Sequence, residues 1–283
     1  MSSASANVND SANVNDIVSP GNSLGIPRVS AVIPTLNEAE NLRVLLPLLP
    51  DWIDELVIVD GYSTDETVEI ARKLCANAII IMATQRGKGA ALRSGFAAAT
   101  GDIIVALDAD CSMHPREIVL LVSALMSGAD FVKGSRFIQG GGTADMSFVR
   151  MIGNWGLTRA VRALFGGSFS DLCYGYLAFW AKHGPLLKPS CNGFEVETFL
   201  NVQALKAGLR IFEVPSFEAR RMHGESNLRA FPDGWRVLKT IIRERFAASV
   251  TPARRPRLGE EDNAKVSRPI EGSAAIRWRE AQQ

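Results

Sequence analysis

The stretch Ile103-Ile104-Val105-Ala106-Leu107-Asp108-Ala109-Asp110 joins five consecutive apolar residues to two carboxylates. A short apolar run of this kind is typical of a strand that is buried on both faces, as in a parallel sheet. Its polar end is expected at the carboxyl edge of that sheet, where parallel α/β proteins bind their ligands. This stretch therefore predicts both a fold class and the place of a site.

The same alternation of a short apolar strand and a longer helical pattern occurs around this stretch. The expected strand and helix pairs are 29–33 with 38–49, 56–59 with 67–74, 79–82 with 90–99, and 103–107 with 116–126. Further along the chain, a helix is expected over 148–165 and a strand over 174–180. Successive β-α units predict an α/β fold with a doubly wound, mainly parallel sheet and helices on both faces. The spacing of Asn37 with Glu40, and of Ser63 with Glu66, also predicts capping boxes at two helix starts.

The bulk composition excludes several classes of protein. The chain has 283 residues, of which 31 are basic and 30 acidic, so a net charge of +1 gives no reason to expect a nucleic-acid partner. Its four cysteines form no Cys-x-x-Cys pair, which argues against a zinc knuckle and a disulfide framework. The N-terminus lacks a basic segment followed by an apolar stretch, and no run of about 18 apolar residues occurs, so we expect neither export nor a membrane span. We expect a cytoplasmic protein that at most lies on the inner membrane face.

One folded domain is expected over residues 28–250, between two tails. Residues 5–10 and 11–16 repeat one polar hexapeptide, so we interpret residues 1–27 as a disordered tail. Residues 251–283 combine prolines with dense charge and few apolar residues, which predicts a mobile C-terminal tail.

Asp108 and Asp110 have the chemistry of a metal site. Mg²⁺ and Mn²⁺ usually take one or two carboxylates together with phosphate oxygens, so an ion here would bridge the motif to a diphosphate. A solvated turn is the alternative, because Asp-x-Asp triplets are common by chance. The loops that follow the two earlier strands, at 34–38 and 60–65, should lie beside this motif at the same sheet edge.

Six short motifs follow one another between about Arg28 and Phe246. They are Pro-Thr-x-Asn-Glu at 34–38, Asp-x-x-Ser-x-Asp-x-Thr at 60–67, Arg-Gly-Lys-Gly at 86–89, Asp-Ala-Asp at 108–110, Gly-Ser-Arg at 134–136, and Glu-Val-Pro at 213–215 followed by Arg-x-x-Gly-Glu-Ser at 221–226. In this order they resemble the family 2 glycosyltransferases of the A-type nucleotide-sugar fold (GT-A). The most similar branch is the polyprenyl-phosphate one, which includes dolichol-phosphate mannose synthase.

The resemblance implies an inverting hexosyltransferase that depends on Mg²⁺ or Mn²⁺. The segment 28–130 would hold the nucleotide-sugar donor, and 131–250 the acceptor. The metal would lie on Asp108 and Asp110. The positions that match the family's donor motifs are Pro34, Thr35, Glu38, Asp60, Ser63, Lys88, Asp108, Ala109 and Arg136. Arg221 and Ser226 would meet the acceptor or phosphate oxygens, and Asp171 would join Asp110 in catalysis, beside the donor sugar.

Local chemistry leaves a plainer interpretation open for several of these residues. The glycines of Arg86-Gly87-Lys88-Gly89 would let backbone amides approach an anion at a helix N-terminus, or would simply form a turn. Asp171 would alternatively cap a turn, and Arg136 or Arg221 would form a surface ion pair. Glu195 and Glu197 are explained by the dipole of the helix that they open.

The acceptor is expected to be a polyprenyl phosphate at the cytoplasmic membrane face. Its phosphate is already an anion and needs no general base. The alternative is the hydroxyl of a saccharide or small metabolite, which would need a base. The candidate bases are Asp171, Glu195, Glu197 and His223. A remoter alternative is a non-catalytic protein that binds nucleotide-sugars. A sugar nucleotidyltransferase is disfavoured, since the first strand is not followed by a glycine-rich loop with an activating Arg and Lys.

Three departures from the resemblance leave the sugar and the base open: Gly61, Ser112 and Asn227 stand where many relatives have aspartate, glutamine and lysine.

The segment 234–246 predicts an amphipathic helix. One apolar face is formed by Trp235, Leu238, Ile242 and Phe246 and is flanked by Val237 and Ile241, whereas Arg236, Lys239, Arg243 and Arg245 are basic. Such a helix either packs its apolar face on the core or lies in a membrane interface, where its basic residues meet anionic lipid. Peripheral membrane contact therefore remains an expectation.

Overall fold

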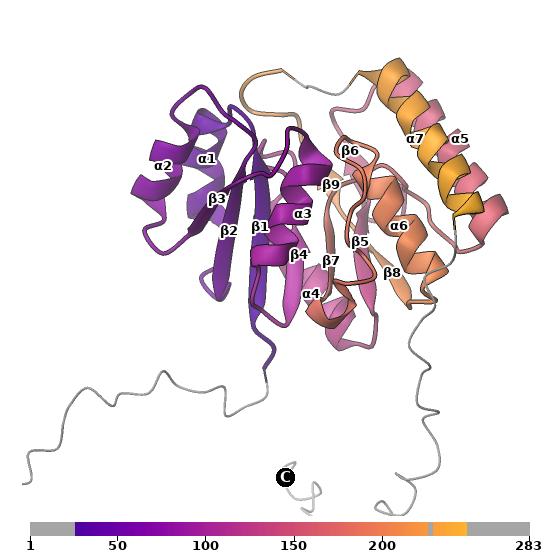
Figure 1. Ribbon diagram of the computed structural model, residues 1–283, viewed down its shortest axis with the longest axis horizontal. Helices are drawn as coiled ribbons and strands as arrows, with labels where there is room; N and C mark the ends of the chain where they lie inside the picture. Colours follow the sequence, from indigo (N-terminus) through magenta and orange to yellow (C-terminus); the bar gives the residue numbers. More distant parts are fainter. Residues whose placement is uncertain (1–25, 226–228, 248–283) are drawn as a thin grey trace, which may run out of the picture. The chain divides into compact units, whose positions relative to one another are not determined.

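The structure is a computed structural model that describes residues 26–225 and 229–247 (Figure 1). A seven-stranded sheet in the order β3-β2-β1-β4-β7-β5-β8 forms its centre. The strands are β1 (Val29–Thr35), β2 (Glu55–Asp60), β3 (Ile79–Met82), β4 (Ile103–Ala106), β5 (Phe131–Ser135), β7 (Leu177–Trp180) and β8 (Ile211–Pro215). Neighbouring strands pair in parallel, except that β7 is antiparallel to both β4 and β5. A small parallel sheet pairs β6 (Gly142–Thr143) with β9 (Phe217–Glu218).

Helices cover both faces because the strands are apolar on both sides. The helices are α1 (Ala39–Leu45), α2 (Thr67–Leu74), α3 (Lys88–Ala98), α4 (Ile118–Met126), α5 (Phe148–Phe165), α6 (Val196–Lys206) and α7 (Ala230–Phe246), with short 3-10 turns at Leu46–Leu48, Pro115–Glu117 and Ala181–His183. One core cluster joins α1, α2 and α4 to the face that carries Ala31 and Ile33, and another joins α3 and α6 to the face that carries Val32. The predicted doubly wound, mainly parallel α/β fold is confirmed.

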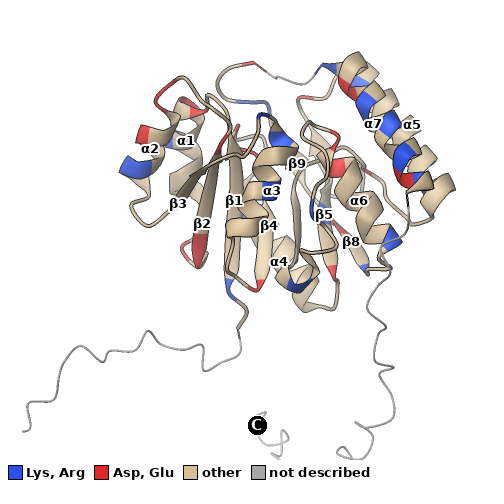
Figure 2. Ribbon diagram, in the orientation of Figure 1, with Lys and Arg blue, Asp and Glu red and all other residues tan. Residues whose placement is uncertain are grey.

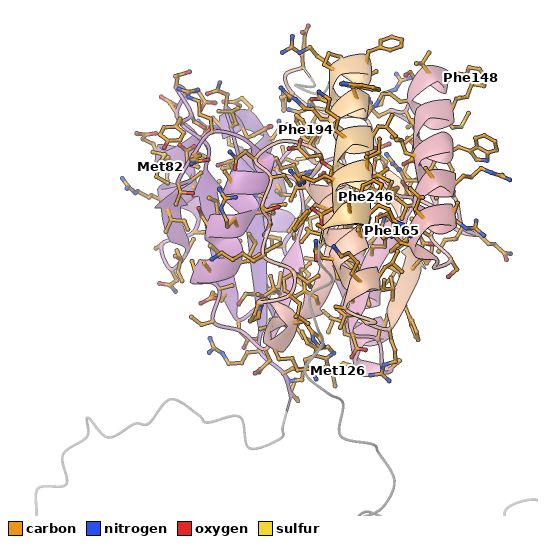
Figure 3. All side chains as sticks on the ribbon, turned by 45° about the vertical axis from the view of Figure 1, so that its right-hand side comes forward. Met82, Met126, Phe148, Phe165, Phe194 and Phe246 are labelled. Atoms are coloured by element: carbon orange, nitrogen blue, oxygen red, sulfur yellow. The ribbon has the colours of Figure 1, made fainter. Side chains whose placement is uncertain are left out.

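An outer layer is formed by α5 and α7, which stand side by side against α6 (Figures 1 and 3). Val161 of α5, Val202 of α6, and Val237 and Ile241 of α7 share a third core cluster. The predicted segments 28–130 and 131–250 contribute strands to one continuous sheet.

Most predicted elements are found within a few residues of their expected bounds. The long helix 148–165 is confirmed as α5, and helix 67–74 as α2. The predicted helix 38–49 ends earlier, at Leu45, and continues as a 3-10 turn that contains Pro47. The predicted strand 174–180 begins only at Leu177. The predicted tails at 1–27 and 251–283 lie outside the described residues, apart from residues 26 and 27.

The predicted capping boxes are wrong, and the residues involved join two loops instead. Neither α1 nor α2 has a side-chain cap at its start. The backbone amide of Asn37 donates to Ser63 Oγ at 2.8 Å, and the backbone amide of Thr64 donates to the side-chain Oδ1 of Asn37 at 2.8 Å. These loops meet because β1 and β2 are parallel neighbours whose carboxyl ends share one edge. The reciprocal bonds therefore fix the loop that carries Glu38 against the loop that follows Asp60.

Candidate active site

A cavity of about 390 Å³ opens at the carboxyl edge of the sheet. Three of its walls follow parallel strands: Glu38 comes after β1, Asp108 and Asp110 after β4, and Arg136 after β5. The predicted site residues that line it are Pro34, Thr35, Glu38, Lys88, Asp108, Ala109, Asp110, Arg136 and Arg221. Asp60, Ser63 and Asp171 are not among the lining residues, and Ser226 lies outside the described residues. The fold thus brings together most of the predicted set.

Lys88 bridges two carboxylates at the inner end of the cavity. It is the first residue of α3, and its Nζ lies 2.6 Å from Asp108 Oδ1 and 2.6 Å from Glu197 Oε1. Burial lowers the pKa of Lys88, but the two carboxylates outweigh this effect and raise it above its usual value. Burial also raises the pKa of Glu197, although Lys88 opposes this. Lys88 is therefore held as a charged ammonium between β4 and α6.

Arg221 bridges a second pair of carboxylates. Its Nη1 donates to Glu38 Oε1 at 2.9 Å, and its Nη2 lies 3.1 Å from Asp110 Oδ2. The loop that carries Arg221 is fixed to α1 by Asn41, whose side chain bonds the backbone amide and carbonyl of His223 at 3.0 and 3.1 Å. Asp110 is consequently paired with a guanidinium that comes from a distant part of the chain.

The donor set of this site suits a hard divalent cation. Within residues 26–225 and 229–247, no group of three or more His, Cys, Asp or Glu is arranged to hold a metal ion. Mg²⁺ and Mn²⁺ do not need such a group, since one or two carboxylates with phosphate oxygens and waters are enough. The side chains of Asp108 and Asp110 line the cavity and are 25% and 16% exposed. They fit an ion that arrives together with a diphosphate.

The glycines of the 86–89 motif allow another part of the backbone to pack closely. The Gly89 amide donates to the Asn192 carbonyl at 2.8 Å. A Cβ atom at Gly87 or Gly89 would collide with the backbone carbonyl of Asn192 or Cys191, and Gly87 also has a φ of +113°. The expectation that this motif offers its amides to an anion is thus wrong for Gly89, because its amide is already bonded within the protein.

Asp171 lies behind Arg136 and does not line the cavity. Its carboxylate is fully buried and accepts hydrogen bonds from Arg136 Nε at 2.7 Å, Arg136 Nη2 at 2.9 Å and Asn154 Nδ2 at 3.1 Å. Arg136, which does line the cavity, also donates to Glu218 Oε1 at 2.9 Å. Burial raises the pKa of Asp171, but the charge and hydrogen bonds of Arg136 outweigh this and hold it below its usual range. This geometry suits a carboxylate that positions Arg136.

Asp60 is a buried carboxylate with a spare acceptor. Its Oδ2 accepts the backbone amides of Tyr62 and Ser63 at 3.1 and 3.0 Å. Its Oδ1 is buried and has no hydrogen-bond partner among the described residues. A buried acceptor without a partner is costly, so a ligand that donates a hydrogen bond would stabilise it.

Three contributors to the site were not singled out in the sequence, whereas Glu197 was explained there by its helix dipole and named as a candidate base for a hydroxyl acceptor. Glu197, Glu218, Asn154 and Tyr174 all line the cavity. Asn154 is buried in the middle of the long helix α5. The one signal for it in the sequence was a polar amide inside a helical pattern. Glu218 gave no such signal because β9 is only two residues long.

The wall of the cavity built by α5 and α7 is largely apolar. It includes Val149 and Leu157 of α5 and Phe231 and Val237 of α7, together with the polar Arg150, Asn154 and Asp233. Figure 3 shows Phe148 at the outer end of α5, away from the sheet. The cavity therefore runs from a charged end at β4 to an apolar end at the outer helices.

The outward surface of α7 differs from the predicted one. Val237 and Ile241 pack on the core, whereas Trp235, Ile242 and Phe246 are 57%, 48% and 84% exposed. The exposed apolar residues of α5 are Phe148, Val149, Met151, Ile152, Trp155 and Leu164. Figure 2 shows the basic residues of α7 on the same outer layer. No helix in the described part of the chain has the length and apolar content to cross a bilayer.

The sequence of the chain is similar to those of known proteins. Residues 30–182 match the family described as Glycosyl transferase family 2. The chain is 30% identical over 213 residues to dolichol-phosphate mannosyltransferase of Pyrococcus furiosus, which covers 71% of this chain and 59% of that protein. It is also 30% identical over 213 residues to undecaprenyl-phosphate mannosyltransferase of Micrococcus luteus, with 71% and 87% covered.

A solved structure shares the fold over most of its length. It is glucosyl-3-phosphoglycerate synthase from Mycobacterium tuberculosis in complex with Mn²⁺, uridine diphosphate and glucosyl-3-phosphoglycerate, with a TM-score of 0.61 and 25% identity. The match covers 81% of this chain and 82% of that one. The chain spans less than two thirds of the Pyrococcus protein but most of the other two.

Proposed function

The chain belongs to glycosyl transferase family 2 and is a glycosyltransferase, and from this premise we propose that it transfers a hexose from a nucleotide-sugar to a polyprenyl phosphate at the cytoplasmic membrane face. The observation that carries the proposal is the two-ended cavity, with Asp108 and Asp110 at one end and the largely apolar walls of α5 and α7 at the other. An acceptor with a phosphate head and a hydrocarbon chain matches both ends. The named activities of the two mannosyltransferase relatives support the same substrate class.

The donor would occupy the charged end. Asp108 and Asp110 would hold Mg²⁺ or Mn²⁺, which when bound neutralises the charge of the departing diphosphate. The unpartnered Oδ1 of Asp60 would accept a hydrogen bond from the base or ribose. The remaining contacts are proposed for Pro34, Thr35, Ser63 and Ala109. The Mn²⁺ and uridine diphosphate in the solved relative support this placement.

The acceptor phosphate would attack the anomeric carbon directly. It needs no general base, so the protein has only to align it with the donor and stabilise charge. Arg136 is proposed to orient phosphate oxygens, because this residue lines the cavity and its guanidinium is fixed by Asp171 and Glu218. A single displacement of this kind inverts the anomeric configuration.

A hydroxyl acceptor is the second candidate, and Glu197 is the observation that favours it. Its carboxylate lines the cavity, and burial raises its pKa above the usual range, which suits a proton acceptor. The solved relative is named for glucosyl transfer to a phosphoglycerate, a small metabolite. Glu195 does not line the cavity, and Asp171 is fully engaged by Arg136.

Donor and acceptor are expected to be identified by one pair of measurements. A thermal-shift screen of GDP-, UDP- and dTDP-sugars with Mn²⁺ should show one stabilising class, since a ligand at a hundred times its Kd stabilises the native state by about 2.7 kcal/mol. That donor should then be consumed with a polyprenyl phosphate, and NMR should show an inverted anomeric configuration in the product. A product with the donor's own configuration would contradict single displacement, and binding without any transfer would favour a non-catalytic role.

Peripheral membrane contact is expected through α5 and α7. The protein should float with vesicles that contain anionic lipid, less so at high salt, and replacement of Arg236, Lys239 and Arg243 with glutamate should abolish flotation. A matched control replaces three exposed basic residues elsewhere, Arg72, Lys73 and Lys188, and should still float. If the unmodified protein stays in solution with anionic vesicles at low salt, the membrane proposal fails and the hydroxyl acceptor is favoured.

A further inference from the structure

Both carboxylates of the Asp-x-Asp motif are already paired with cations of the protein. Lys88 Nζ lies 2.6 Å from Asp108 Oδ1 and donates to Oδ2 at 2.8 Å, so it engages both oxygens of that carboxylate. Arg221 Nη2 lies 3.1 Å from Asp110 Oδ2. A divalent cation would need oxygens of these same two carboxylates at about 2.0–2.1 Å. A metal ion and these two side chains therefore compete for the motif.

Each cation has a second carboxylate partner outside the motif. Lys88 also contacts Glu197 at 2.6 Å, and Arg221 also contacts Glu38 at 2.9 Å. The side chains of Glu197 and Glu38 are 6% and 8% exposed, so they are less accessible to an incoming ion than the motif itself.

Glu197 and Glu38 would hold Lys88 and Arg221 in the site when a metal ion binds the oxygens of Asp108 and Asp110. Arg221 bonds Glu38 through Nη1 and Asp110 through Nη2, so loss of Asp110 frees one edge of the guanidinium while the other stays bound. Lys88 has three ammonium donors and keeps Glu197 when Asp108 is withdrawn. Both freed donors would still face the cavity, since Lys88 and Arg221 line it.

We propose that Lys88 and Arg221 are exchangeable counter-ions of the Asp108 and Asp110 carboxylates. Without ligands they neutralise the motif; when a divalent cation and a diphosphate bind together, they pass to the diphosphate oxygens while Glu197 and Glu38 retain them. This inference rests on the proposed function, because it assumes that the metal and donor bind at this end of the cavity. Under this proposal, metal binding and diphosphate binding are cooperative. The metal ion displaces Lys88 and Arg221 from the carboxylates, and the diphosphate oxygens become the new partners of these two side chains.

The test compares Mn²⁺ binding alone with Mn²⁺-dependent binding of a nucleoside diphosphate. Free Mn²⁺ is followed by EPR in titrations of the unmodified protein, Arg221→Gln and Lys88→Met. Both variants should bind Mn²⁺ alone more tightly, by up to about fivefold, because a partly exposed ion pair contributes up to roughly 1 kcal/mol. Both should bind UDP or GDP more weakly at saturating Mn²⁺. These opposite changes are not expected from a general loss of structure, which would weaken both affinities.

A matched control is Arg150→Gln. Arg150 also lines the cavity, but its ion pair is with Asp145 at 3.4 Å and not with the motif. Its Mn²⁺ affinity should stay within about twofold of the unmodified protein, since a partly exposed charge that is paired with Asp145 and not with the motif contributes little. An equal increase in this variant would mean that general charge, and not direct exchange, sets Mn²⁺ affinity, and would overturn the proposal.

The retaining role of Glu197 is tested by a double-mutant cycle. At saturating Mn²⁺, Glu197→Gln should weaken UDP or GDP binding, and the same change in the Lys88→Met background should have no further effect. Additive losses would overturn this role.

The remaining outcomes separate this inference from the proposed function. Variants that bind Mn²⁺ no more tightly than the unmodified protein overturn the exchange, while nucleotide binding that requires Mn²⁺ in the unmodified protein would leave the proposed function standing. If the unmodified protein binds no Mn²⁺ even with UDP or GDP, both proposals fail. The two single variants lie on different elements, so one that does not fold leaves the other to decide.

Discussion

Replacement of Asp110 with asparagine is expected to abolish sugar transfer while the protein remains folded. The change removes one of the two charges that would hold the metal ion. A bound metal ion contributes several kcal/mol of transition-state stabilisation, or about a thousandfold in rate. Asparagine keeps an oxygen where Asp110 Oδ1 accepts the Ser112 amide at 3.0 Å, so the local turn should persist. Initial rates with donor, acceptor and Mn²⁺, together with the melting temperature, would measure both effects.

Two controls accompany this prediction. EDTA should reduce the rate of the unmodified enzyme to the same level, and added Mn²⁺ or Mg²⁺ should restore it. Asp145→Asn removes another carboxylate from the cavity lining, one that pairs with Arg150, and should retain most of the activity. Full activity of the Asp110 variant in EDTA would end the metal hypothesis.

Replacement of Asp171 with alanine is expected to cost both stability and activity. The Asp171 and Arg136 side chains are 0% and 2% exposed, and removal of one partner from such a buried pair typically destabilises a protein by about 3–5 kcal/mol. Arg136 would keep only Glu218 and would no longer be fixed at the cavity wall. Chemical denaturation would measure the stability loss, and steady-state kinetics should show a decrease in kcat of about a hundredfold.

The same prediction separates a positioning role from direct catalysis. If Asp171 acts through Arg136, then Asp171→Asn and Arg136→Lys should lower kcat to a similar extent, and the double variant should be little worse than either. Asp130→Asn is a suitable control for stability, because Asp130 also binds an arginine, Arg210, whose side chain is 59% exposed. A large loss of kcat in Asp171→Asn with Arg136→Lys fully active would instead show that Asp171 takes part in the reaction itself.

The sheet was predictable because its signals are local. Apolar runs such as 103–107 and helical patterns such as 148–165 depend on residues within one element, and the elements form where these patterns occur. The carboxyl-edge position of Asp108 and Asp110 follows from strand direction alone. Their place in the cavity lining therefore needed no knowledge of the distant chain.

Two of the mistaken predictions involve residues whose partners lie far away in the sequence. Asn37 bonds Ser63 and Thr64 across two loops, although its local spacing is that of a helix cap. The Gly89 amide bonds the carbonyl of Asn192, although a glycine-rich helix start is typical of an anion site. On α7, the packing of α6 and α5 selected Val237 and Ile241 as the buried face.

The sequence by itself determined the α/β class, the family, and the edge of the sheet at which the acidic motif lies, because periodicity and motif order are properties of short segments. Only the tertiary structure decided which charges meet: Lys88 with Glu197, Arg221 with Glu38, and Arg136 with Asp171. Each of these pairs joins elements that are distant in the chain and adjacent in the fold. A side chain's hydrogen-bond partners depend on how whole elements pack, and that information is absent from the spacing of residues along the chain.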